Sequence, residues 1–340
     1  MGHLAVIGID LAKNVFQLHG ADKQGRCIFK KMLRRSQMLK FFAQTEPCLI
    51  GMEACGSAHY WARELSSLGH EVRLMPPQYV KPYVKTNKND EADAEAISEA
   101  VTRPNMRFVS VKSVEQQTLL LIHRERDGLV KERTALISRI RATLSEFGIV
   151  IPAGRRRFKN WFLTEYGKFE GKLPQLLQQH IAFMLNRLHQ KESDIEQLEV
   201  EIDQQSKRNA ECKRLLELPG IGRLTSSALV ATVGDARVFK SGRQLSAWLG
   251  IVPKQYSSGG KQTLQGISKR GDAYLRRLLI HGARAVIRHS KPGSPWYNWI
   301  QSLESRMHKN KVIVALANKL ARIAWALLAK GVRYQRVEEA

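Results

Sequence analysis

The hydrophobic pattern of the first hundred residues alternates between strand-like and helix-like segments. Residues 4–10 (LAVIGID) and 48–53 (CLIGME) are continuous apolar runs, typical of strands covered on both faces of a sheet. Shorter runs predict strands at residues 15–20, 27–33 and 71–75, and helical patterns predict helices at 36–44, 56–68 and 90–101. Three strands, a helix, a strand, a helix, a strand and a helix form the order of the RNase H superfold. The pattern therefore predicts an RNase H-like α/β domain over residues 1–110.

From residue 111 the apolar positions follow a heptad-like period. Two series carry it: Leu119, Ile122, Leu129, Leu136, Ile140 and Leu144, then Leu177, Leu185, Leu188, Ile195, Leu198 and Ile202. Both stretches are long, charged and free of internal proline. They predict coiled-coil helices over residues 111–208, either antiparallel within the chain or between chains. We therefore expect a homo-oligomer, a dimer or a dimer of dimers.

A basic and aromatic insert at residues 151–162 (IPAGRRRFKNWF) breaks the heptad pattern. Such a cluster is often only a solvated loop. Its arginines, Arg155, Arg156 and Arg157, lie beside Phe158 and Trp161, and arginine with aromatic side chains also suits contact with a polyanion. Both interpretations stay open from the residues alone.

Residues 209–340 predict a mostly helical domain. It opens with LELPGIG at residues 216–222, a hairpin of the helix-hairpin-helix kind, in which Gly220 and Gly222 would let backbone amides approach a phosphate. A capped helix at 241–249, a glycine-rich loop (YSSGGK) and helices at 272–288 and 294–306 follow. Residues 311–328 are apolar but interrupted by Lys319 and Arg322, which predicts an amphipathic helix rather than a membrane span.

The charge of the chain indicates its partners. Among 340 residues, 55 Lys or Arg stand against 31 Asp or Glu, a net charge of +24. The last 132 residues hold 23 of the basic residues and only 7 of the acidic ones. A generally solvated basic surface would spread the excess, whereas its concentration in one region favours a nucleic-acid partner.

The spacing of cysteines and histidines argues against a structural metal site and against a secreted, disulfide-bonded protein. The four cysteines form no CxxC pair, and we expect them reduced and mostly in or near the core. The ten histidines show no ligand spacing, so we expect no structural zinc. The apolar N-terminus lacks a basic flank, so we expect no signal peptide. We expect a cytoplasmic, nucleoid-associated protein.

Four carboxylates are candidates for metal chemistry. Asp10 and Glu53 end strands that lie side by side in the RNase H topology, and Asp90 and Asp93 share one face at a helix start. Such a set can hold Mg²⁺ or Mn²⁺, and two ions could clamp both oxygens of a phosphodiester displacement. Asp90 alone could be a helix cap, but an aspartate ending a buried strand, as Asp10 does, needs a partner.

A sugar-kinase or actin-like ATPase is a rival for the N-terminus, because these folds also begin with a strand ending in Gly-Ile-Asp. Here the turn that follows is Leu-Ala-Lys-Asn, without a Gly-Thr pair, and no second glycine-rich phosphate loop is present. The strongly basic composition also disfavours a metabolite kinase. We therefore keep the nucleic-acid interpretation.

Five segments together resemble one family: GIDLAKNVF, MEACGS, KNDEADAEAI, LPGIG and GIVPKQYSSGGKQTLQGISKRGDAYLRRLL. They resemble the insertion-sequence transposases of family one-ten and its eleven-eleven branch, which are DEDD-type recombinases guided by a bridge RNA (seekRNA). The resemblance follows the family's order over nearly the whole chain, with the coiled-coil middle matched by pattern only. It implies a RuvC-like N-terminal domain and a serine-containing C-terminal transposase domain.

The resemblance also implies roles for individual residues. The family's four acids fall on Asp10, Glu53, Asp90 and Asp93, and its Glu-Ala-Thr-Gly appears here with Cys55 in the third place. The nucleophilic serine falls on Ser258, with Ser257 as the second choice, although YSSGGK by itself would be an ordinary turn. No His or Asp base is close in sequence, so the metal-bound carboxylate domain, of the same or a partner subunit, is expected to complete the site. Phosphates would be held nearby by Lys261, Lys269, Arg270, Arg276 and Arg277.

The favoured function is a site-specific DNA recombinase that moves an insertion sequence. By resemblance, the serine forms a 5′-phosphoserine link, and a structured guide RNA pairs with donor and target DNA. Two alternatives remain: a metal-dependent Holliday-junction resolvase that uses water as nucleophile, and a non-catalytic nucleic-acid-binding scaffold. The scaffold is disfavoured by four acids in a basic protein, because carboxylates repel phosphate unless metal intervenes.

Overall fold

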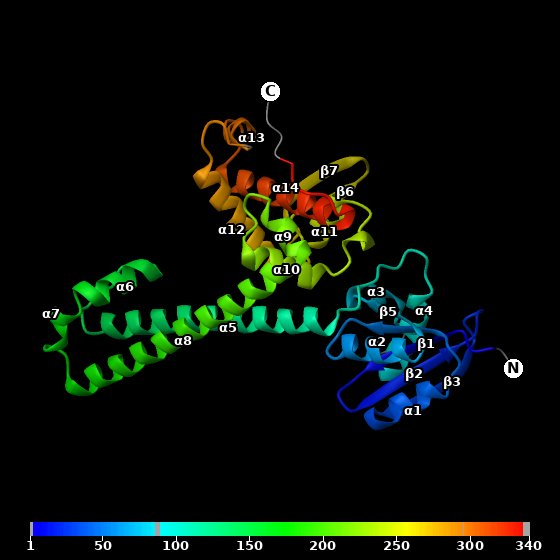
Figure 1. The fold of residues 1–340 in the computed structure, drawn as a ribbon. Helices are drawn as coiled ribbons and strands as arrows, with labels where there is room; N and C mark the ends of the chain where they lie inside the picture. Colours follow the sequence, from blue (N-terminus) through cyan, green and yellow to red (C-terminus); the bar gives the residue numbers. More distant parts are fainter. Residues whose placement is uncertain (1–2, 86–88, 295, 336–340) are drawn as a thin grey trace. The chain divides into compact units, whose positions relative to one another are not determined.

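The chain folds into two compact units. The computed structural model describes residues 3–85, 89–294 and 296–335 (Figure 1). One unit comprises Met1–Gln116 with Val233–Val238, and the other comprises Gln117–Thr232 with Phe239–Ala340. The long helices of the predicted coiled-coil segment thus belong to the same unit as the C-terminal helical domain.

A five-stranded sheet organises the N-terminal unit. Its strands are β1 (Val6–Leu11), β2 (Val15–Ala21), β3 (Cys27–Arg34), β4 (Leu49–Glu53) and β5 (Glu71–Met75), in the order β3-β2-β1-β4-β5. β1 is antiparallel to β2 and parallel to β4, with Ile9 opposite Met52. All five strands lie where the sequence predicts them, within two residues, and their order is that of the RNase H topology.

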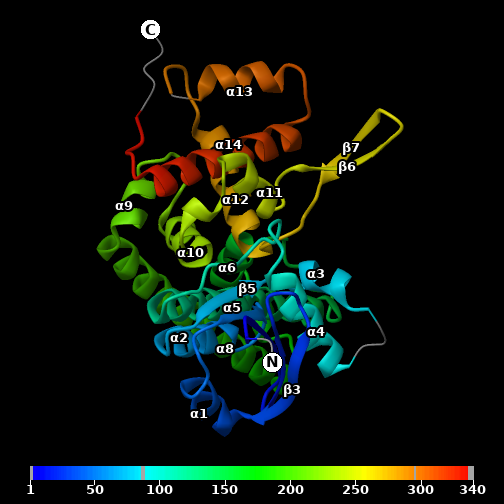
Figure 2. The same ribbon diagram turned by 90° about the vertical axis from the view of Figure 1, so that its right-hand side faces the viewer.

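Helices cover both faces of this sheet (Figure 2). Ile7, Ile9 and Phe16 pack with α1 (Met38–Ala43) and α2 (Ala58–Ser67) in one buried cluster. Val6 and Met75 pack with α4 (Asp90–Val101) in another. Successive residues of β1 point to opposite faces, so its unbroken apolar sequence reflects burial on both sides. The sequence did not predict α3 (Pro77–Val80) and the short turn of 3₁₀ helix that follows it.

Two glycines bring α4 against the sheet. A Cβ on Gly8 of β1 would collide with the backbone of Ala94 and Ser98 in α4. A Cβ on Gly51 of β4 would collide with the side chain of Val101. Only glycine therefore allows the helix to lie directly on the two central strands, which fixes where its N-terminus falls.

Two long antiparallel helices begin the C-terminal unit: α5 (Val114–Ser145) and α8 (Gln175–Arg208). Ion pairs of Arg126 with Glu199 and of Lys191 with Glu132 join them in antiparallel order. Leu136, Ile140 and Leu144 of the first heptad series pack in one buried cluster with Leu188 of the second. This contact lies within the chain, and oligomerisation through these helices stays a prediction.

The basic and aromatic insert is a helix and not a loop, which corrects one of the two interpretations left open. It forms α6 (Arg155–Thr164), followed by the short α7 (Gly167–Glu170). Phe158 is buried, and Trp161 and Phe162 pack against Tyr166 within the cluster that joins α5 and α8. These aromatic side chains contribute to the core, because apolar burial stabilises the helix tip, and Trp161 and Phe162 are half-buried.

The rest of the unit is a helical bundle with one β-hairpin. Its helices are α9 (Ala210–Leu216), α10 (Arg223–Val233), α11 (Gly242–Trp248), α12 (Ala273–His289), α13 (Tyr297–Glu304) and α14 (Lys309–Lys330), and its hairpin is β6 (Pro253–Ser258) with β7 (Lys261–Ile267). The hairpin replaces the predicted glycine-rich loop. By length and composition α14 could cross a membrane, but half of its most apolar stretch is buried. It packs on α9, α11, α12 and α13 as a core helix.

The cysteine prediction was half right. Cys212 is buried and Cys48 is half-buried, and burial raises the pKa of each thiol to about 11. Cys27 and Cys55, however, are exposed. All four are free thiols, as the absence of paired spacing predicts.

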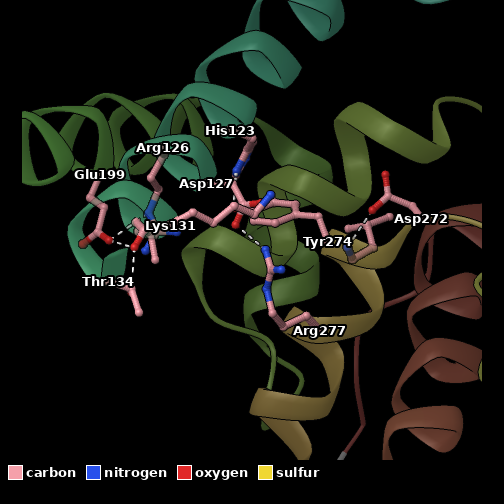
Figure 3. A network of polar contacts seen from close by, with 11 residues as sticks. His123, Arg126, Asp127, Lys131, Thr134, Glu199, Asp272, Tyr274 and Arg277 are labelled. Carbon is pink, nitrogen blue, oxygen red and sulfur yellow. Dashed lines mark hydrogen bonds and ion pairs between the residues drawn. The ribbon is translucent and has the colours of Figure 1, made fainter. Parts of the chain in front are cut away.

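A buried polar network fastens α5 to the helical bundle (Figure 3). The ring of His123 in α5 hydrogen-bonds Ser227 of α10 through Nε2 (2.6 Å) and Tyr274 of α12 through Nδ1 (3.0 Å). A neutral imidazole donates one of these bonds and accepts the other. Beside it, Arg277 of α12 pairs with Asp127 of α5. Burial, and secondarily the charge of Arg126, lowers the pKa of His123 to about 4.

Acid should therefore destabilise the C-terminal unit through His123. The folded-state pKa lies below the ordinary 6.5, so the unfolded chain takes up the proton first as the pH falls. The free energy of unfolding should fall between about pH 6.5 and pH 4 by on the order of 3 kcal/mol. Urea unfolding followed by circular dichroism measures this, and His123→Gln should lose that part of the pH dependence. A variant as acid-sensitive as the wild type would contradict the assignment.

Candidate metal centre and serine hairpin

The end of β1 carries the first candidate carboxylate. Residues Val6–Ile9 are buried between the two helical layers, and Asp10 is the first residue of the strand to reach partial exposure. β1 and β4 run parallel with Ile9 opposite Met52, so Asp10 and Glu53 follow at the same edge of the sheet. The register therefore places two acids where two central strands end.

The N-terminus of α4 brings two more. Asn89 caps the helix, its side-chain oxygen accepting a hydrogen bond from the backbone N–H of Ala92 at 2.7 Å. Asp90 and Asp93 lie in the first turn, where the helix dipole favours negative charge. Asn89 was not among the predicted functional residues, although an Asn directly before an acidic first turn is a recognisable cap.

The structure brings together three of the four predicted acids. Carboxylate oxygens of Asp10, Asp90 and Asp93 all lie within 4.8 Å of one another. Three carboxylates at this spacing repel unless a cation lies among them. Their hard oxygen donors fit Mg²⁺ or Mn²⁺, which bind through one to a few carboxylates and keep several waters.

Glu53 lies beside this group but is not part of it. It ends β4 as the neighbour of Asp10, and the carboxylates of both residues help to raise the pKa of the Cys55 thiol. Burial is the larger cause of that shift. The thiol is thus kept protonated at neutral pH and adds no further negative charge to the centre. A role for Glu53 as a ligand stays a prediction.

The predicted nucleophile lies at the tip of the β6–β7 hairpin. Ser258 ends β6 opposite Lys261, and the turn between them is Gly259-Gly260. Both glycines have positive φ, 55° and 76°, as a two-residue hairpin turn with two left-handed positions requires. Every residue of β6 is exposed. The tip can therefore approach a substrate backbone without rearranging a core.

The hairpin register separates the two serine candidates. Residues directly opposite in an antiparallel pair share a face, so Ser258 shares one with Lys261 and Ser257 shares the other with Gln262. Ser257 already accepts a hydrogen bond from the amide of Gln255 at 2.8 Å. A lysine beside the hydroxyl suits a phosphate, so the geometry favours Ser258.

Backbone contacts hold the base of the hairpin. A Cβ on Gly250 would collide with the backbone of Arg270, and one on Gly271 would collide with the carbonyl of Trp248. The backbone N–H of Ser268 also donates to the carbonyl of Val252 at 2.8 Å. The exposed tip is thus carried on a closely packed crossing of two chain segments.

Three of the predicted phosphate-binding arginines have protein partners. Arg276 donates to the carbonyls of Leu249 (3.1 Å) and Arg270 (3.3 Å). Arg277 pairs with Asp127 and lies over the ring of Tyr274, and Arg155 pairs with Glu192. These contacts tie elements of the unit together, and phosphate binding by the three arginines stays a prediction. The remaining predicted cations are exposed: Arg156, Arg157, Lys261, Lys269 and Arg270.

The predicted helix-hairpin-helix segment has a packing role. It connects α9 to α10. A Cβ on Gly282 of α12 would collide with the carbonyl of Gly220, and a Cβ on Gly220 (φ 90°) would collide with the side chain of Val286. This packing requires glycine at residue 220, whereas a Cβ on Gly222 would face open space. Phosphate binding by the two glycines of the segment stays a prediction.

Acidic residues gathered at one edge of a mixed sheet of this order are typical of metal-dependent nucleic-acid enzymes. The family description "Transposase" of the DEDD type matches residues 7–149, and "Transposase IS116/IS110/IS902 family" matches residues 212–298. The chain therefore belongs to the IS110 family of insertion-sequence transposases, which catalyse DNA strand transfer.

Full-length relatives support this membership. The chain is 49% identical, over 98% of its length and 99% of the relative's, to the probable family 20 transposase of Pseudomonas aeruginosa. It is 42% identical to the transposase of insertion sequence element IS1328 from Yersinia enterocolitica, over 99% of this chain and 100% of the relative. It is also 42% identical to the IS1111A transposase of Coxiella burnetii, over 98% and 92%.

Replacing one carboxylate of the group should remove metal binding. Asp90→Asn should abolish the rise in melting temperature caused by Mn²⁺, and strand transfer should fall by on the order of 100-fold or more, because metal supplies several kcal/mol of charge stabilisation. In metal-free buffer the variant should melt no lower than the wild type, since repulsion is relieved. Differential scanning fluorimetry with and without Mn²⁺ measures this.

Glu91→Gln is the matched control. Glu91 lies in the same helical turn and its charge is removed in the same way, but it lies outside the three-carboxylate group. It should keep both the Mn²⁺ response and the activity. Equal losses in the two variants would point to the helix terminus in general and not to a metal site.

Proposed function

We propose that this transposase is an RNA-guided, site-specific DNA recombinase in which Ser258 attacks the DNA backbone and mobilises an insertion sequence. The observation that carries the proposal is the position of Ser258, exposed at the tip of a firmly based hairpin and paired with Lys261. An ordinary surface turn needs neither the backbone crossing at its base nor a cation beside its hydroxyl.

The proposed cleavage exchanges one phosphodiester bond for another. The Oγ of Ser258 forms a bond to phosphorus, and the bond from phosphorus to the 3′ oxygen breaks. The serine proton passes to a base or to water, and the departing 3′ oxygen takes up a proton from water. The products are a 5′-phosphoserine link and a free 3′ hydroxyl. The reverse attack by a 3′ hydroxyl of another strand restores the serine and completes the exchange, so no external energy source is needed.

Residues of the chain would divide this work. Lys261 would hold a non-bridging phosphate oxygen and neutralise part of the charge that develops on it. Asp10, Asp90 and Asp93 would hold the divalent ion, with Glu53 beside them. When bound, Mg²⁺ or Mn²⁺ supplies Lewis-acid stabilisation of phosphate charge and lowers the pKa of an oxygen nucleophile.

A metal-dependent nuclease of the junction-resolvase kind is the second candidate. It is favoured by one observation, that three carboxylates converge within the N-terminal unit itself. In this mechanism water attacks, the serine takes no part, and no covalent protein–DNA species forms. The two candidates therefore differ in a measurable product.

Trapping the adduct separates them. Ser258→Ala should still bind DNA but yield no covalent protein–DNA band on a denaturing gel, because the attacking oxygen is gone. Ser257→Ala is the matched control and should form the band. The opposite pattern would shift the nucleophile by one residue, and cleavage unaffected by either substitution would favour the nuclease.

We infer that an RNA chooses the target, because the sequence offers few recognisable base-reading motifs. It contains no zinc-finger spacing and no RNP signature, although its helical pattern leaves a helix-turn-helix open, and its basic residues suit phosphate contacts, which carry no sequence information. A site-specific enzyme built in this way needs another reader, and base pairing to a guide provides one. The likeness to bridge-RNA-guided recombinases supports the same proposal.

Reprogramming the RNA tests this proposal. Changing guide-loop bases of the RNA that copurifies with the protein should redirect insertion to the matching new target, as sequencing of insertion junctions would record. The unchanged RNA with the same new target serves as the control. If protein treated with RNase recombines its native target equally well, the guided mechanism is wrong and a direct DNA reader must exist.

A further inference from the structure

A large groove lies along one face of α14, away from the serine. Its volume is about 1480 Å³, and it is bordered by the start of α11, strand β7, Trp299 of α13 and α14 itself. That volume exceeds the roughly 300–1,000 Å³ that holds one small ligand, so there is room for a chain of several units. All of these elements belong to the C-terminal unit.

The groove explains why α14 is apolar on two sides. One face of the helix, including Val312 and Leu316, is buried in the core of the bundle. The groove face carries Val314, Ala315 and Ile323, which are only partly buried. These partly exposed apolar side chains form a floor against which an apolar group of a ligand could pack.

Four cations line the groove: Arg243, Lys311, Lys319 and Arg322. Among the described residues that line it, none is acidic, and none of the four cations takes part in an ion pair of the described chain. A ligand that carries both anionic and apolar groups would complement this lining, whereas an uncharged hydrophobic helix would leave the cations unpaired.

Lys319 lies between two indole rings. Its Nζ is 4.7 Å from the ring centroid of Trp296 and 4.5 Å from that of Trp299. Burial, and then the charge of Arg322, lowers the pKa of this ammonium. Among the described residues, the two indole faces offset part of the free energy lost when the ammonium leaves water. A phosphate oxygen in the groove would supply the missing counter-charge.

We propose that this groove binds an unpaired stretch of a DNA strand, with bases against the apolar floor and the indole of Trp299, and phosphates on the four cations. Aromatic side chains within a basic groove are how proteins hold single strands without sequence preference. A duplex would use the cations but not the floor, because its bases stay stacked inside. DNA is chosen because it is the substrate of strand transfer, and β7 joins the groove wall to the hairpin tip. The inference rests on the transposase class and not on Ser258 or a guide RNA.

Charge reversal on one helix provides the test. Lys311→Glu with Arg322→Glu alters the groove, while Lys309→Glu with Lys330→Glu places the same charges on exposed positions of α14 outside it. The probe is an oligodeoxythymidine of about 15 nucleotides, and the protein is the whole chain. The Lys311→Glu/Arg322→Glu variant (the groove pair) should bind it at least about tenfold more weakly. The magnitude of its slope of log affinity against log salt should fall by about 1.4. The control pair should stay within about twofold of the wild type. Equal losses in both pairs would show general attraction only and overturn the proposal.

Photocrosslinking locates the bases. A strand carrying 5-iododeoxyuridine should crosslink to Trp299 or Trp325 in the wild type and in Ser258→Ala, so a failed serine mechanism leaves this result intact. Equal crosslinking of the annealed duplex would overturn the assignment to a single strand. Equal crosslinking of 5-iodouridine RNA would overturn the assignment to DNA.

Two further measurements test other occupants. Competition by polyglutamate as strong as by the oligonucleotide would overturn the proposal in favour of an acidic peptide site. A change of molar mass in the groove pair, measured by light scattering, would assign the face to contacts between copies.

Discussion

The direct contact of α4 with the two central strands is the constraint on which the catalytic end of the N-terminal unit depends. Gly8 brings strand backbone against helix backbone, and Gly51 leaves room for the side chains of Ile97 and Val101, so the two glycines set the position of the helix axis. The first turn of α4 then falls at the end of β1, and Asp90 and Asp93 reach Asp10 without any long side chain. Short, rigid carboxylates placed in this way lose little conformational entropy on binding a cation.

The same device is used a second time at the serine hairpin. Gly250 and Gly271 let two chain segments cross with backbone in contact, and the strands that leave this crossing carry Ser258 at their tip. Both candidate sites thus reach the surface, yet each is supported by a contact that tolerates no added methyl group. The candidate metal ligands belong to one unit, and the candidate serine and most of the cations belong to the other.

Much of the fold follows from sequence because its signals are local. Apolar runs such as residues 4–10 gave the strands, and their order gave the sheet topology that brings Asp10 near Asp90 and Asp93. Contacts with distant partners could not be predicted. The sequence does not reveal that Arg277 pairs with Asp127, that Phe158 is buried in the cluster of α5 and α8, or that Gly220 packs against α12. The groove beside α14 could not be predicted from the sequence, because apolar residues on two faces of that helix suggest that both faces are buried.

The packing of α14 gives the order of synthesis a structural meaning. The helix contacts α9, α11, α12 and α13, so the core of the C-terminal unit cannot close until residues 309–330 have left the ribosome. The N-terminal unit, by contrast, consists of residues 1–116 and 233–238. A product that stopped before α14 would therefore keep its carboxylate group but lack the bundle that supports the β6–β7 hairpin.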